Sequence, residues 1–230
     1  QQMIGSLFKQ LDNLTAQNER KIDLLKQLKQ AYLQQIFSQE LRFAGFRDDW
    51  KQRKLGNYMT IPNKEKVIVK STSDLMTVKL NLGGVEEGSN RETLSLGSTI
   101  YYKRKAGQFI YGKQNFFNGS MAIIPDNFDG KATSGDVPSL NINNIVVDYL
   151  YTYVSRNEYW RSKEASASGT GSKRIHEATL QNFEISVPSF DEQQKIGSLF
   201  KQLDNLITLN QQKLNLLKKQ KQAFLQKMFI

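Results

Sequence analysis

The chain begins and ends with two copies of one long segment. Residues 1–14 and 193–206 agree at 13 of 14 positions, and at the same offset residues 1–37 and 193–229 agree at 24 of 37. Neither copy contains proline, and neither contains a further glycine after Gly5 or Gly197. Leu, Lys, Gln and Ala, which recur throughout both copies, favour helix. The chain must therefore accommodate two long helices of nearly the same sequence.

Both copies carry apolar residues at seven-residue spacing. We assign the seam of a coiled coil to two columns, namely Ile4, Leu11, Asn18, Leu25 and Tyr32 with Leu7, Leu14, Lys21, Leu28 and Gln35. The second copy repeats these columns from Ile196 and Leu199, and Phe8, Ile22 and Ile36 widen the apolar face of the first. Such a stripe requires burial. Either each helix packs on its own domain, or the copies pack on each other within a chain or across a homodimer; we favour mutual packing.

The two asparagines in the seam predict the alignment of the helices. The first helix runs into the middle of the chain and the second runs out of it, so helices packed together within one chain must be antiparallel. Asn18 and Asn210 occupy the same seam position, and we predict that they lie in one layer. A shift by one heptad would bury each amide against leucine, at about 1–3 kcal/mol for an unpaired polar group. A seam asparagine can fix register in this way.

The two copies begin differently. Ser189, three residues before Glu192, forms a capping-box signature directly after Pro188. The first copy starts at Gln1, without such a cap and without an initiator methionine. We therefore expect this chain to be part of a longer protein.

Between the repeats, the sequence predicts a linker over residues 38–49 and a globular domain over residues 50–188, with the helices at 1–37 and 189–230. Strand patterns occur at residues 66–70, 76–82, 98–103, 108–112, 121–124, 140–142 and 183–187. We expect 98–103 and 108–112 to form a strand–turn–strand unit with a basic tip, and one main helix from 145 to about 165. The expected class is α+β, a mostly β domain flanked by an antiparallel coiled coil.

The formal net charge of +10 suggests a polyanionic partner. The charge is spread along the chain, with 20 cations against 16 carboxylates in residues 38–190 and excess cations in both repeats. No cysteine is present, which excludes disulfides and thiolate metal sites and fits a cytoplasmic protein. No apolar run approaches the ~20 residues of a membrane span, so we expect no membrane partner.

Catalytic signatures are weak. His176 is the single histidine, so a zinc cluster cannot be assembled, and a surface polar role is expected for it. Asp126 and Asp129, followed by Lys131, superficially match a nuclease pattern. That chemistry requires carboxylates on separate strands around Mg²⁺, whereas this spacing favours a turn. We expect no catalysis, no metal and no cofactor.

Two polar segments are candidates for binding DNA. The first interleaves cations and amides with aromatic residues that we expect to lie mostly in the core, and its members have side chains suited to base edges: Lys103, Arg104, Lys105, Lys113, Gln114 and Asn115. The second, Ser172, Lys173 and Arg174, follows a small-residue loop and suits a phosphate backbone, or is simply solvated. We expect substitutions in the first segment to alter sequence preference and those at Lys173 and Arg174 to weaken all binding evenly.

Three stretches together resemble a known family. They are GTGSKRIHEATLQNFEISVPSFDEQQKIGSLFKQLD at residues 169–204, FRDDW at 46–50 before KLG at 54–56, and FIY at 109–111 with the later Asn118-Gly119 and Asp129-Gly130. They are similar to the C-terminal half of the specificity subunit of type I restriction–modification systems. The repeated helix is the most specific part of this resemblance, which covers essentially the whole chain.

The resemblance implies a non-catalytic subunit in which a target recognition domain reads one half of a bipartite site in double-stranded DNA. It implies that the paired helices carry methyltransferase subunits, and that the restriction subunit of the same system joins the complex. This chain departs from the family pattern in having one recognition domain, so we expect it to read one half-site. The alternative is a coiled-coil adaptor whose β domain binds protein.

Overall fold

The computed structural model describes residues 2–88, 99–167 and 173–228. Contacts divide the chain into two compact units. We call Gln1–Phe46 with Ser198–Ile230 the coiled-coil unit, and Arg47–Gly197 the β-rich unit. None of the described helices has the length and apolar composition needed to cross a lipid bilayer.

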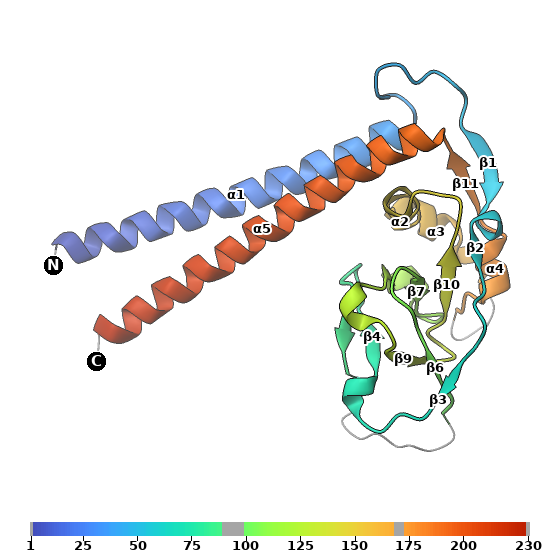
Figure 1. The fold of residues 1–230 in the computed structure, drawn as a ribbon. Helices are drawn as coiled ribbons and strands as arrows, with labels where there is room; N and C mark the ends of the chain where they lie inside the picture. The colour runs from blue at the N-terminus through green and yellow to red at the C-terminus, as the bar shows by residue number, and fades with distance from the viewer. Residues whose placement is uncertain (1, 89–98, 168–172, 229–230) are drawn as a thin grey trace. The chain divides into compact units, whose positions relative to one another are not determined.

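The coiled-coil unit consists of two long helices. Helix α1 (Gln2–Phe37) lies beside the greater part of α5 (Phe190–Met228) and runs antiparallel to it, so that the two chain ends lie at the same end of the pair (Figure 1). Lys29 bridges to Asp204 at 2.5 Å, and Lys218 bridges to Glu19 at 2.7 Å. These ion pairs are half-exposed and contribute little each. The predicted antiparallel coiled coil is confirmed.

The seam uses a different pair of heptad columns from the predicted pair. Leu11, Asn18, Leu203 and Asn210 are buried as expected, but the second column is exposed, with Leu14 at 46% and Leu206 at 45%. The column that was expected only to widen the stripe is buried in its place, with Ile22, Ile36, Phe200 and Leu214 at 5% exposure or less. The assignment of the second column was therefore wrong. Both columns lie next to the first at three- or four-residue spacing, so the pattern of apolar residues allowed either choice.

The structure brings Asn18 and Asn210 together inside the seam. They are 5% and 9% exposed, and Asn18 Nδ2 donates to the backbone oxygen of Asn210 at 2.8 Å. Asn210 Nδ2 donates to the backbone oxygen of Leu206 at 2.7 Å, one turn earlier in its own helix. Each amide group thus donates to a carbonyl within the seam. The role of these residues in selecting the register stays a prediction.

The β-rich unit contains short strands in small antiparallel sheets (Figure 1). One sheet pairs β1 (Lys51–Lys54) with β11 (Glu184–Val187), and a second has the order β2 (Met59–Thr60), β10 (Ser139–Ile142), β7 (Phe109–Tyr111), β8 (Met121–Ile123). A third has the order β3 (Lys66–Val67), β6 (Tyr101–Lys103), β9 (Ala132–Ser134), and the fourth pairs β4 (Met76–Val78) with β5 (Val85–Glu87). The expected α+β class is confirmed.

The predicted strand–turn–strand unit is absent from the described sheets, because β6 and β7 belong to different ones. Strand β6 pairs with β3 and β9, whereas β7 pairs with β8 and β10. The connecting residue Arg104 is 3% exposed, and its backbone bonds to residues 130 and 131 next to β9. A buried residue here carries the chain from one sheet to the next, so the expected exposed basic tip does not form at Arg104.

The predicted main helix is divided in two. Helix α2 (Val147–Val154) has Ser155 as its C-cap. Helix α3 (Asn157–Ser162) begins after Arg156, whose backbone is extended at φ −63° and ψ 132°. A 3₁₀ turn, η5 (Glu164–Ser166), follows. Helix α4 (Glu177–Gln181) precedes β11.

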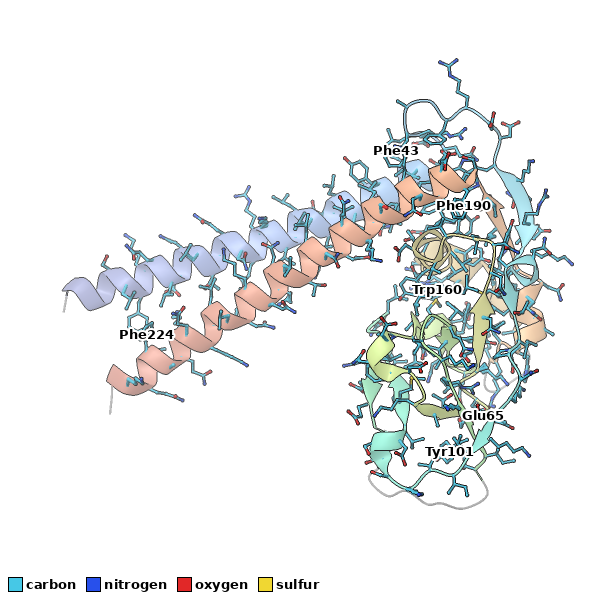
Figure 2. The ribbon with its side chains drawn as sticks, viewed as in Figure 1. Phe43, Glu65, Tyr101, Trp160, Phe190 and Phe224 are labelled. Atoms are coloured by element: carbon cyan, nitrogen blue, oxygen red, sulfur yellow. The ribbon has the colours of Figure 1, made fainter. Side chains whose placement is uncertain are left out.

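The core of the β-rich unit is largely aromatic. Phe109, Tyr111, Phe116 and Tyr149 are fully buried, and the Tyr111 and Phe116 rings meet edge to face at 5.6 Å between centroids. Figure 2 shows Trp160 on α3, in the half of this unit that contains α2. Several aromatic residues near the candidate DNA-binding segments are therefore core residues, as expected.

The first two turns of α5 are anchored in the β-rich unit. The Glu192 amide donates to Ser189 Oγ at 3.4 Å, and Glu192 Oε2 accepts a hydrogen bond from the Trp50 indole at 3.2 Å. Gln193 Oε1 accepts from the amide of Val146, at the start of α2. Gly197 completes this packing, because a Cβ atom there would lie 2.9 Å from the backbone nitrogen of Tyr149.

Candidate nucleic-acid interface

Three segments that are far apart in the sequence meet in the β-rich unit. The amide of Lys113, just after β7, donates to the carbonyl of Asp136 at 2.9 Å, and the amide of Ile175 donates to the carbonyl of Lys113 at 3.0 Å. The Tyr111 hydroxyl also donates to the carbonyl of Ile175 at 3.1 Å. These bonds place the 113–115 loop, the β9–β10 turn and the segment around Arg174 side by side. We call this junction the three-segment site.

The three-segment site borders a groove of about 350 Å³. Its wall includes the polar residues Asn115, Ser120, Ser134 and Asp136 together with apolar residues of β4. Tyr101 also lines the groove, and Figure 2 shows it near Glu65 at one end of the unit. Amides, hydroxyls and a carboxylate around a groove can exchange hydrogen bonds with the edges of bases.

Gln114 and Asn115 are exposed at the three-segment site, whereas Lys113 is only partly exposed. The Lys113 ammonium lies 3.0 Å from the Glu177 carboxylate, and both side chains are nearly covered, at 12% and 11% exposure. Burial alone would raise the pKa of Glu177, but the hydrogen bond and charge of Lys113 hold it below its usual value. Lys113 therefore ties the loop to α4, and Gln114 and Asn115 are the members of this loop that face solvent.

Lys173 and Arg174 both form ion pairs. Lys173 Nζ lies 2.6 Å from Glu164, and the hydrogen bond from Lys173 lowers the pKa of that carboxylate. Arg174 Nη1 lies 2.9 Å from Asp136 Oδ1. The predicted companion of these residues, Ser172, lies outside the described residues. Arg174 thus belongs to the three-segment site through Asp136.

Arg104 is buried. It is 3% exposed, and its guanidinium donates to Thr133 Oγ1 at 2.7 Å, to Ser134 O at 3.2 Å and to Val137 O at 3.0 Å. Burial lowers the pKa of Arg104 to about 10, which still leaves it charged at neutral pH. The side chain secures the β9–β10 turn, so in this structure Arg104 is not exposed for the predicted contact with bases.

Lys103 and Lys105 are exposed but lie farther from the three-segment site. Tyr101 pairs with Ser134 in the β6–β9 ladder, and Lys103 pairs with Ala132, so the chain moves away from the β9–β10 turn as it passes Lys103. Lys103 Nζ lies 3.8 Å from Glu65. These two lysines remain candidates for contacts with phosphate or bases outside the groove.

Two features of the β-rich unit were not predicted from the sequence. Asp136 was not selected, because an aspartate in a Ser-Gly-Asp turn gives no indication of its distant partner Arg174. Strand β1 exposes all four of its residues, including Lys51, Arg53 and Lys54. The KQRK run was a visible signal for this second cationic surface.

The described residues contain no group of three or more His, Cys, Asp or Glu side chains that could hold a metal ion. The Asp126 segment forms a 3₁₀ turn, η4 (Asp126–Phe128), and Asp129 Oδ1 accepts from the amide of Ala106 at 2.8 Å. Lys131 bonds to Ser73 O and pairs with Glu87 at 2.8 Å. The residues that superficially resembled a nuclease pattern thus have structural partners, as expected for a turn.

The chain matches a family model and a curated relative. Residues 47–219 match the family model of the type I restriction modification DNA specificity domain. Over 125 residues, the chain is 26% identical to the type I restriction enzyme MjaVIII specificity subunit of Methanocaldococcus jannaschii. That match covers 54% of this chain and 25% of the relative.

Two solved structures share the fold. The S subunit of a type I restriction–modification system from M. genitalium matches with a TM-score of 0.64 and 16% identity, over 98% of this chain and 59% of that one. The HsdS subunit from Thermoanaerobacter tengcongensis matches with a TM-score of 0.56 and 15% identity, over 98% and 56%. The chain thus spans a quarter to three fifths of the proteins it matches. The family model covers most of the chain, and the resemblance found in the sequence is confirmed: this chain belongs to the family of type I restriction modification DNA specificity domains.

Proposed function

We propose that this chain recognises one half of a bipartite DNA target for a type I restriction–modification enzyme and performs no catalysis itself. The observation that carries the proposal is the family match, which spans the whole β-rich unit and extends into α5. The net charge of +10 and the exposed cations on β1 and β6 suit a polyanionic ligand. The three-segment site supplies amide, carboxylate and guanidinium groups of the kinds that distinguish bases.

Duplex DNA binding as a function of salt tests this proposal. The logarithm of the association constant should fall linearly with the logarithm of salt concentration, with a slope of about −0.9 per phosphate neutralised. Fluorescence anisotropy with a labelled mixed-sequence duplex measures this slope, and the same duplex with Mg²⁺ and S-adenosylmethionine should remain uncut and unmethylated. Binding that is absent at low salt would favour the protein-binding adaptor instead.

We propose further that the coiled-coil unit carries the methyltransferase subunits and, with them, the restriction subunit. The second predicted seam column, which is exposed in the structure, supports this role. Its residues Leu14 and Leu206 occupy equivalent positions in the two repeats and are both nearly half exposed. Leu209 and Leu216 are more exposed still, at 60% and 66%. Helices with this much uncovered leucine suit a helical partner.

Paired charge substitutions test the partner surface. Leu14→Lys with Leu206→Lys should weaken capture of the purified methyltransferase subunit of the same system at least tenfold, because lysine at these positions cannot fill an apolar contact. Gln10→Lys with Gln202→Lys is the matched control, since these glutamines are exposed and also equivalent in the repeat. Equal capture by both variants would place the partner elsewhere.

A further inference from the structure

The pairing of Arg174 with Asp136 bears on how this chain selects DNA. Arg174 and Asp136 side chains are 39% and 63% exposed, so the pair is open to a ligand from solvent. The carboxylate offsets the charge of the guanidinium and holds Nη1 through a hydrogen bond. A cation that binds phosphate benefits from free charge, whereas a residue that reads a base benefits from fixed orientation. The pair therefore suits base recognition better than the phosphate contact expected for Arg174.

The turn that carries Asp136 is held from within the fold. Arg104 donates to the carbonyls of Ser134 and Val137, which flank Gly135 and Asp136, and the amide of Val137 donates back to Ser134 O at 3.1 Å. The carbonyl of Asp136 itself accepts from the Lys113 amide. The carboxylate therefore projects from a turn that is bonded on both sides, and such preorganisation limits the entropy lost on binding.

The donor and acceptor pattern of this pair matches one base pair. In the major groove guanine offers the acceptors N7 and O6, and the paired cytosine offers the donor N4 amino group. A guanidinium donates to the former, and a carboxylate accepts from the latter. Asn115 and Gln114, exposed on the adjoining loop, have the amide groups that pair with adenine.

We propose that Asp136 and Arg174 together read one G·C base pair of the target, with Arg174 donating to guanine and Asp136 accepting from the cytosine amino group. This rests on the proposed function of the chain as a DNA reader. In this proposal Arg104 is a positioning residue, because it holds the turn that carries Asp136 and does not contact the DNA.

Selection from a randomised duplex library tests the assignment. The wild-type chain should enrich a motif, and Arg174→Lys and Asp136→Asn should each reduce the preference for G·C at the same single position by about tenfold or more while leaving the other positions unchanged. Arg174→Lys retains the charge, and Asp136→Asn is nearly isosteric, so both should melt within a few degrees of the wild type. Lys105→Ala is the comparison variant, which removes an exposed cation outside the three-segment site and should leave the preference for G·C at this position unchanged.

The outcomes separate this assignment from the proposed function. A wild-type motif that is unchanged in both variants would overturn the reading of G·C by this pair and leave DNA recognition intact. An even loss of affinity in Arg174→Lys would return Arg174 to a phosphate contact. A wild-type chain that enriches no motif would overturn the proposed function, and this assignment with it.

Discussion

At the scale of single residues, the two repeats differ in what surrounds equivalent positions. Gly197 packs so closely against α2 that an added Cβ would lie 2.9 Å from Tyr149 N and 3.0 Å from Asp148 Cβ. An added Cβ at Gly5 would meet nothing within 4 Å. The same residue in the same repeated motif is thus sterically required in one copy and unconstrained by the described structure in the other.

This difference predicts opposite effects of one substitution. Gly197→Ala should destabilise the chain by about 1–3 kcal/mol, because the backbone of α2 must shift to admit the methyl group. Gly5→Ala should be neutral or stabilising by up to about 1 kcal/mol, since alanine favours helix over glycine. Urea unfolding of the two variants measures both values. A loss of similar size in both would mean that helix packing at Gly197 is looser than the structure indicates.

At the scale of the elements, Asn18 and Asn210 form a buried polar layer in the coiled coil. Asn18→Leu alone should destabilise the helix pair by about 0.5–1.5 kcal/mol, because it removes the bond from Asn18 Nδ2 to the backbone oxygen of Asn210. Asn210→Leu alone should cost a similar amount, because it removes the bond from Asn210 Nδ2 to the backbone oxygen of Leu206. The double substitution should raise thermal stability and broaden the oligomeric states seen by sedimentation, since the polar group that selects the register is lost.

Two spectroscopic signals distinguish unfolding of the coiled coil from unfolding of the β-rich unit. Helices α1 and α5 contain 36 and 39 residues, against 8, 6 and 5 in the other α-helices, so circular dichroism at 222 nm reports mainly the coiled coil. Trp50 and Trp160 both lie in the β-rich unit, so tryptophan fluorescence is the internal control. A double variant that melts earlier at 222 nm would contradict the role of this layer.

At the scale of the whole molecule, the sequence predicted what depends on local and repeated patterns. The paired helices, the α+β class and most strand positions followed from periodicity within single segments. The seam column did not, because Leu7, Leu14 and Leu28 are as apolar as the residues that replace them, and only the partner helix decides between the two columns.

The candidate site was predictable only in part, for the same reason. Gln114, Asn115 and Arg174 were selected by their chemistry, but their proximity depends on backbone bonds between segments about 20 to 60 residues apart. Arg104 lies in a run of three cations that reads as exposed, and its burial depends on Thr133, Ser134 and Val137. No local pattern contains that information.

The layer shared by Asn18 and Asn210 gives the coiled coil an internal symmetry. Two antiparallel helices of nearly one sequence, aligned with equivalent residues opposite each other, are related by an approximate twofold axis through that layer. The half-turn exchanges Leu14 with Leu206, and it exchanges the Lys29–Asp204 ion pair with the Lys221–Asp12 ion pair. A single polypeptide thereby acquires the symmetry of a homodimer, and a partner that recognises the repeated surface finds two equivalent places to bind, facing in opposite directions.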